Sequence, residues 1–349
     1  MGCSDSRIKE EPETKITSKT SLPVLSKNFE MFNSEVYKNI KKEEKEEREK
    51  FEEYEEEAVL EPLVIWENLN MDCETYYSLV NDLSKNPHLL EFTMDNFEVE
   101  GNCDIFINLA RALIKMTSIT RLEFSNVFNT GNKVIKSVAK IFESNKLVES
   151  LVIRNLKLQE RDGKYLKLIL AELAGNLCYF EISEIAIDLL FSQVLAGIQA
   201  NDTIAELVLC KLNMCERDFT NLIELIQIKS NIVSLNLSEN PIKEGVNIFL
   251  RLNIVHLETL RLNECQIDDE LFDILLEGLK ENKSLKELEV KENKITEISV
   301  NYLKKFFDIN SCLKVLNLSE NLIMKEQMYD ILSGESMNKI ICDFTPKDR

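Results

Sequence analysis

A short pattern of apolar and polar positions recurs through the C-terminal three quarters of the chain, and its clearest copy runs from Leu285 to Ile295. Leu288 and Val290 alternate with charged residues, which predicts a short strand with one buried and one exposed face. Asn293 follows where the chain should turn away, because a side-chain amide can bond to the backbone of neighbouring turns. Apolar residues at helical spacing come next, so we expect a helix that packs against the strand. They are Ile298, Leu303, Phe306 and Phe307.

Nine segments of this kind follow one another, and they open at Leu89, Ile119, Val148, Leu177, Ile204, Ile232, Leu257, Leu285 and Leu313. From Leu89 to Leu313 is 224 residues in eight steps, so the mean period is 28. The pattern L-x-x-L-x-L-x-x-N-x-I at this period, with a helix in each second half, resembles the ribonuclease-inhibitor type of leucine-rich repeat. The resemblance implies an α/β horseshoe of about nine to ten strand–helix repeats, with a parallel sheet on its concave face.

The two ends of the repeat array are expected to be caps, since an edge repeat has one face without a partner. A degenerate first unit places Leu60, Leu63, Ile65 and Asn68 at the matching offsets, with Trp66 among them. Residues 340–344 are predicted to close the stack as a final strand, after a last helix around Met328. The solenoid is therefore predicted to span residues 60–345.

The turn position departs from the family pattern in the N-terminal half. It is occupied by Asn240, Cys265, Asn293 and Asn321 in the last four repeats, but by Phe97, Val127, Leu156, Ile185 and Leu212 in the first five. An apolar side chain cannot make the hydrogen bonds of an amide, so these turns must be held by packing. We expect the N-terminal half to be less regular.

Composition excludes several classes of protein. The net charge of −19 is unfavourable for binding nucleic acid, whose phosphates attract basic surfaces. The nine cysteines form no C-x-x-C pair, so no disulfide framework is indicated. Neither a secretory signal nor a long apolar run is evident, and we expect the protein to be intracellular.

The N-terminus begins Met-Gly-Cys-Ser-Asp-Ser, which matches the signal for N-myristoylation at Gly2. One myristoyl chain gives only marginal membrane binding, and palmitoylation of the adjacent Cys3 would supply the second anchor. Residues 1–40 are predicted to be a disordered, acylated arm, poor in apolar residues, that tethers the protein to the cytoplasmic face of a membrane. The alternative is an unmodified tail in which Gly2 and Ser6 fall into the motif by chance.

Residues 41–59 are rich in glutamate, with opposite charges at helical spacing such as Glu46 and Lys50. We interpret the segment as a solvated helix or linker that leads into the solenoid. The alternative is a binding segment for a basic partner, anchored by Phe51 and Tyr54.

Signatures of catalysis and of cofactor binding are sparse. The two histidines, His88 and His256, both stand beside a residue that opens a repeat, where a loop histidine is the simpler interpretation. Neither a dinucleotide-binding glycine motif nor a phosphate-binding loop is present, and Cys210 and Cys215 have no histidine near them in sequence. We therefore expect no catalytic site, no metal, no cofactor and no small-molecule substrate.

The exposed side of the strands is the surface that such a solenoid offers to a partner. The position before the turn is Glu239, Glu264, Glu292 and Glu320 in the last four repeats, which predicts an acidic ladder that would favour a basic protein partner. The alternative is that these glutamates only make the connection between strand and turn soluble and have no role in binding. Tyr179, with Val152 and Val208, marks a less charged patch that could hold an aromatic anchor, and Arg121, Arg154 and Arg261 also face outward.

These patterns predict a non-catalytic, membrane-tethered scaffold that binds a protein on its concave face. The same repeat family includes GTPase-activating proteins of the Ran type and actin-capping proteins. A regulator of a small GTPase and a cytoskeleton-associated protein are therefore the alternatives.

Overall fold

The computed structural model describes residues 62–101, 104–128, 134–187, 190–242, 252, 256–323 and 340–341, which belong to one compact unit, Leu60–Arg349. The predicted acylation site at Gly2 and Cys3, the glutamate-rich segment and the predicted helices after Ile242 and around Met328 lie outside these residues. The sequence-based interpretations of those segments remain predictions.

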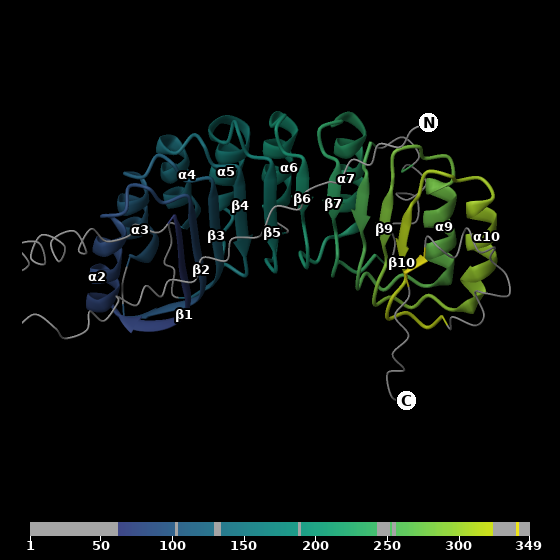
Figure 1. The fold of residues 1–349 in the computed structure, drawn as a ribbon, viewed down its shortest axis with the longest axis horizontal. Coiled ribbons are helices and arrows are strands. Elements are labelled where there is room, and N and C mark those ends of the chain that lie inside the picture. The colour runs from purple at the N-terminus through teal and green to yellow at the C-terminus, as the bar shows by residue number, and fades with distance from the viewer. Residues whose placement is uncertain are drawn as a thin grey trace, which may run out of the picture. The chain divides into compact units, whose positions relative to one another are not determined.

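One parallel sheet runs through the described residues, with eleven strands in the order of the chain (Figure 1). Its strands are β1 (Leu63–Asp72), β2 (Glu91–Glu100), β3 (Arg121–Val127), β4 (Ser150–Arg154), β5 (Tyr179–Ser183), β6 (Glu206–Val208), β7 (Ser234–Asn236), β8 (Thr259–Arg261), β9 (Glu287–Glu289), β10 (Val315–Asn317) and β11 (Ile340–Ile341). Helices alternate with the strands, which confirms the predicted α/β solenoid. The pairing of β11 with β10 agrees with the predicted closing strand.

The helices follow the strands at nearly every repeat of the described chain. They are α2 (Cys73–Leu83), α3 (Ile105–Leu113), α4 (Val134–Ser144), α5 (Asp162–Leu168) with the π-helical turn η1 (Ile169–Leu173), α6 (Phe191–Ala200), α7 (Glu216–Ile228), α9 (Asp269–Leu279) and α10 (Val300–Phe307), the last preceded by the 3-10 turn η3 (Glu297–Ser299). Asp268 caps α9, since its side chain accepts a hydrogen bond from Leu271 N.

The core lies between the sheet and the helices. All nine residues predicted to open a repeat are at most 2 % exposed, as are strand residues such as Phe124 and Leu288. Each such side chain contributes about 1.5–3 kcal/mol by leaving water, and neighbouring repeats share that burial. Ile298 is an exception to the predicted stripe, because it falls in η3 and is 58 % exposed, whereas Leu303 and Phe306 of α10 are buried.

The predicted offsets of the first repeat are wrong by one residue. Trp66 of β1 pairs with the buried Met94 of β2, and Leu63 and Ile65 face outward with 41 % and 54 % exposure. Trp66 packs against the rings of Tyr76, Phe92 and Phe97, with ring centroids 5.1–6.4 Å apart. Apolar residues occupy both faces of β1, so alternation alone did not fix its register.

A left-handed residue follows the strand core in ten repeats. These residues, with φ between 46° and 60°, are Asn68, Asn96, Asn126, Asn155, Glu184, Lys211, Glu239, Glu264, Glu292 and Glu320. Asparagine tolerates this conformation better than other residues with a side chain. In the first repeats its amides also form a ladder, since Asn96 Nδ2 donates to Asn68 Oδ1 at 2.6 Å and Asn155 Nδ2 to Asn126 Oδ1 at 2.7 Å.

The next position distinguishes the two halves of the sheet. Asn240 is fully buried, accepts from Leu212 N at 2.9 Å and donates to Leu209 O and Leu237 O at 2.7 and 2.9 Å. In the N-terminal repeats this position is apolar and buried, as at Phe97, so packing holds the turn as predicted. The strands shorten along the chain, from ten residues in β2 to five in β4 and three in β6 and β9.

A second set of asparagines, which the sequence analysis did not single out, lies between a helix end and the next strand in five repeats. Asn310 is buried and donates to Leu279 O and Asn282 O of the preceding repeat, while its Oδ1 accepts from Leu313 N at 3.0 Å. Each stands three residues before an opening residue: Asn86, Asn145, Asn201, Asn282 and Asn310. This spacing is the signal that could have found them.

Candidate protein-interaction surface

The face of the sheet opposite the helices, called here the helix-free face, carries the outward side chains of every strand. Because the strands pair in register, these side chains form rows across the sheet. One row runs through Thr93, Glu123, Val152, Glu181, Val208, Asn236, Arg261, Glu289 and Asn317. Neighbouring strands are about 4.8 Å apart, so residues of one row interact directly.

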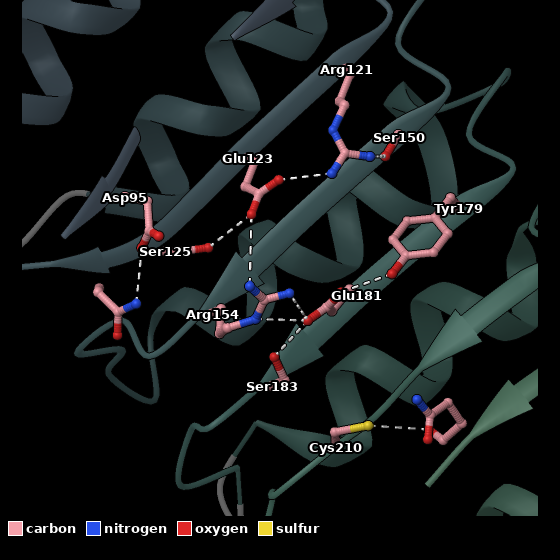
Figure 2. Close-up of polar contacts among 12 residues, drawn as sticks. Asp95, Arg121, Glu123, Ser125, Ser150, Arg154, Tyr179, Glu181, Ser183 and Cys210 are labelled. Atoms are coloured by element: carbon pink, nitrogen blue, oxygen red, sulfur yellow. Dashed lines mark hydrogen bonds and ion pairs between the residues drawn. The ribbon is translucent and has the colours of Figure 1, made fainter. Parts of the chain in front are cut away.

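Ion pairs dominate the centre of this face (Figure 2). Arg121 Nη2 lies 2.7 Å from Glu123 Oε2, and Arg154 Nη2 lies 2.6 Å from Glu181 Oε1. Arg154 also approaches Glu123 at 3.7 Å, so β3, β4 and β5 are joined through alternating charges.

Glu181 is the most buried member of this network, with only 7 % of its side chain exposed. Burial alone would raise the pKa of Glu181, but hydrogen bonds from Arg154, Tyr179 and Ser183 outweigh it and hold that pKa below its usual range. The Tyr179 hydroxyl donates to Glu181 at 2.8 Å, and burial together with this carboxylate raises the pKa of the tyrosine far above its ordinary value. The Tyr179 side chain is therefore uncharged and is held in one position on the helix-free face by this hydrogen bond.

A second network lies on β8 and β9. Arg261 Nε donates to Glu289 Oε1 at 3.0 Å, and Asn263 Nδ2 donates to Glu289 Oε2 at the same distance. Each outward-facing arginine considered above thus has a glutamate partner within the sheet. An arginine that reaches out to a GTPase would first have to give up this pairing.

The acidic ladder predicted from the sequence lies along one edge of the helix-free face. Glu239, Glu264 and Glu292 are all left-handed, and the backbone N–H of each donates to a carbonyl of the following repeat at 2.8–3.1 Å. The row continues to Lys211, whose Nζ lies 3.5 Å from both Glu184 and Glu239. A lysine can therefore occupy this row and bridge two of its glutamates.

A depression of about 380 Å³ opens over β5–β8 on the helix-free face. Arg154, Tyr179, Glu181, Ser183, Glu184, Glu206, Val208, Cys210, Ser234, Asn236, Glu239 and Arg261 line it. Three of the six predicted partner-binding residues, Tyr179, Glu239 and Arg261, meet here. Glu264, Glu292 and Glu320 lie outside it, in later repeats.

The predicted apolar patch around Tyr179 differs from the expectation. Val152 is outward but only 1 % exposed, although its neighbours in the row are Glu123 and Glu181. Val208 is half-buried and contributes to the depression. Glu184 and Glu206, which the sequence analysis did not select, also line it. Their position follows only from the register of the strands, which sequence reasoning had not combined into rows.

The structure places the groups that the sequence analysis considered for metal binding and catalysis. The described part of the chain holds no cluster of three side chains that could bind a metal. His88 and His256 are exposed beside the start of a repeat, as expected of loop histidines. Burial raises the pKa of the Cys210 and Cys265 thiols to about 12, so neither is a thiolate at neutral pH. Among the described helices, none has the length and the low polarity that a membrane span requires.

Comparison with solved structures shows the fold class to be that of a leucine-rich-repeat solenoid. The leucine-rich-repeat protein LegL7 from Legionella pneumophila is 15 % identical, with a TM-score of 0.51 over 78 % of this chain and 90 % of that one. An internalin from Listeria monocytogenes, InlF, is 16 % identical over 76 % of this chain and 70 % of its own, with a TM-score of 0.42.

Comparison of sequences adds a partial relative. The chain is 31 % identical over 143 residues to Protein PAC2 of Saccharomyces cerevisiae, a match that covers 34 % of this chain and 27 % of that protein. The chain thus spans about a quarter of the length of the curated relative that it matches. A scan of family models finds no match.

Proposed function

We propose that the protein is a non-catalytic scaffold that binds a protein partner on the helix-free face of its sheet. The observation that carries the proposal is the alignment of outward polar side chains from successive strands, with a depression among them. Fixed ion pairs such as Arg154–Glu181 hold these side chains in place before binding, which lowers the entropic cost of docking. The raised pKa values of the Cys210 and Cys265 thiols and the exposed positions of the two loop histidines favour a non-catalytic role.

We also assign the repeats to the ribonuclease-inhibitor type. The mean period of 28 and the full helices, such as α7 and α9, that follow the short strands support this assignment. Repeats with a shorter period usually carry an extended segment or a tight helical turn in place of a full helix.

The partner is expected to be basic where it meets the acidic ladder, and reversal of the ladder tests this. A variant with Glu239, Glu264, Glu292 and Glu320 all changed to lysine should lose a discrete set of partners in affinity capture from cells. Lys211 already adopts the same left-handed conformation, so lysine fits the backbone of these positions.

The matched control carries the same charge change outside the helix-free face, at the exposed residues Glu143, Glu160, Glu172 and Glu281. It should retain the partners of the wild type. If both variants lose the same proteins, net charge rather than the ladder attracts them. If neither variant loses a partner, the glutamates of the ladder are exposed to solvent and have no role in binding.

Membrane attachment through acylation of Gly2 and Cys3 is the second part of the proposal. A myristoyl and a palmitoyl chain together would anchor the protein at the cytoplasmic face of a membrane, whereas one chain binds only reversibly. Gly2→Ala should move the protein from the membrane to the soluble fraction of cells, and Cys3→Ser should do so in part. Mass spectrometry that finds a free N-terminal glycine in the wild type would overturn this part of the proposal.

The two alternatives receive no support from the surface. Arg121, Arg154 and Arg261 are all held by glutamates, which disfavours a regulator that presents an arginine to a GTPase. Stimulation of GTP hydrolysis by a candidate GTPase, or sedimentation with actin filaments or microtubules without membrane, would nevertheless replace the scaffold by one of them.

A further inference from the structure

The depression over β5–β8 exists because short side chains stand between long ones. Val208 and Cys210 of the β6 repeat and Ser234 of β7 form its centre. Long side chains border it on both sides, namely Arg154 and Tyr179 towards β4 and Arg261 towards β8. The floor is therefore partly apolar, whereas the walls are polar.

Ion pairs hold both bordering arginines in place and neutralise them. Arg154 bonds to Glu181 at 2.6 Å, and Arg261 bonds to Glu289 of β9 at 3.0 Å. Because each guanidinium already has a carboxylate, neither leaves an unbalanced positive charge over the hollow.

The remaining charge of the depression is negative, and it stands at both ends. Four glutamates and two arginines line the hollow. Glu206, which is exposed, stands at the start of β6. At the other end, Glu184 follows β5 and Glu239 follows β7, and Lys211 Nζ lies 3.5 Å from both carboxylates.

From this geometry we infer that the depression receives one lysine or arginine side chain of the protein partner. The aliphatic stem would lie over Val208 and Cys210, and the cationic head would bond to Glu206 or to the pair Glu184 and Glu239. Lys211 shows the second arrangement within the chain itself. The volume of about 380 Å³ is at the lower end of the range for ligand pockets, which suits a single side chain rather than a large ligand. The inference rests on the proposed function and names the anchor of that interaction.

Fluorescence anisotropy of a labelled heptapeptide, Gly-Ser-Lys-Lys-Lys-Ser-Gly, tests the inference on the full chain at low ionic strength. Val208→Arg fills the hollow and adds a positive charge, so it should weaken binding by about tenfold or more. Glu206→Gln removes one carboxylate and should weaken binding by about threefold. Acetylation of the three lysines of the peptide should abolish binding.

Two controls separate the depression from the general negative field of the protein. Leu147→Arg adds the same charge at an exposed site outside the helix-free face, and Glu143→Gln removes the same charge from α4. Both should bind the peptide like the wild type, and circular dichroism should show all four variants folded. Equal weakening by the controls, or unchanged binding by Val208→Arg, would overturn the inference.

Two further results distinguish this inference from the proposed function. If the wild type captures partners from cells and Val208→Arg captures the same partners equally well, the scaffold function is kept and the depression is not the site that anchors the partner. If the peptide binds as expected but no partner is captured, the depression binds cationic side chains and the scaffold function is rejected. Binding of spermine that is tighter than that of the peptide and is lost in Val208→Arg would replace the partner by a small polyamine.

Discussion

Replacement of Asn240 by leucine is expected to lower the free energy of unfolding by about 3–5 kcal/mol. The side-chain amide accepts from Leu212 N and donates to Leu209 O and Leu237 O, and the residue is fully buried. Leucine has a similar volume but leaves Leu212 N and Leu209 O without this partner, at about 1–3 kcal/mol for each buried group, and leaves Leu237 O with only the weak donor of the Cys265 thiol. Urea denaturation followed by circular dichroism measures the loss.

A matched control is Asn231→Leu, which removes one hydrogen bond, to Ile204 O, at a half-buried site and should cost about 1 kcal/mol. The single tryptophan adds a second readout, because Trp66 lies at the other end of the sheet in β1. If the repeats unfold together, Asn240→Leu lowers the urea midpoint of unfolding by the same amount whether it is followed by Trp66 fluorescence or by circular dichroism. A loss below 1 kcal/mol would show that packing alone holds the C-terminal turns.

Replacement of Arg154 by methionine is expected to cost about 2–4 kcal/mol at pH 7. It should also reverse the sign of the contribution that Glu181 makes to the pH dependence of stability. The methionine keeps most of the packing but leaves the carboxylate of Glu181 buried without its cation. In the wild type the pKa of Glu181 is held below its usual range, so its contribution is present above the unfolded pKa and is lost as acid protonates the folded state.

Without Arg154, burial is opposed only by the hydrogen bonds from Tyr179 and Ser183, and we expect the pKa of Glu181 to rise from its lowered position to above its unfolded value. The folded variant then binds more protons than the unfolded chain, so its stability should fall as the pH rises from about 4 towards 7. Urea midpoints at several pH values between 4 and 8 measure this slope. As a control, Lys85→Met breaks an exposed ion pair with Asp82 and should leave the midpoints nearly unchanged. Parallel pH profiles for the wild type and Arg154→Met would contradict the assigned role of the network.

The repeat architecture followed from the sequence because each strand carries its own signal. Leu288 and Val290 define one face, Asn293 ends the strand, and the copies of this unit have one physically sensible stacking. The first repeat lacked such a signal, since Leu63 and Ile65 are as apolar as Val64 and Trp66. Its register is marked by the left-handed Asn68, aligned with Asn96, and by the burial of Trp66.

The surface was less predictable than the core, because it depends on pairs of strands rather than on one strand at a time. Tyr179, Glu239 and Arg261 were selected for separate reasons, and the register brings them to one depression. Glu206 was not selected as a binding residue because nothing in its own repeat distinguishes it. The burial of Val152 depends on side chains of the two neighbouring strands. Side-chain pairing across repeats is a property of the folded sheet.

The central claim is that the helix-free face contacts the partner, and site-specific photo-crosslinking in cells tests it most directly. A photoreactive amino acid would replace Thr259 or Glu287 on that face, and Glu172 or Asn221 on the helical side of the molecule. We predict crosslinked adducts with the same partner from Thr259 and Glu287 and none from Glu172 and Asn221. Adducts only from the helical side would contradict the account.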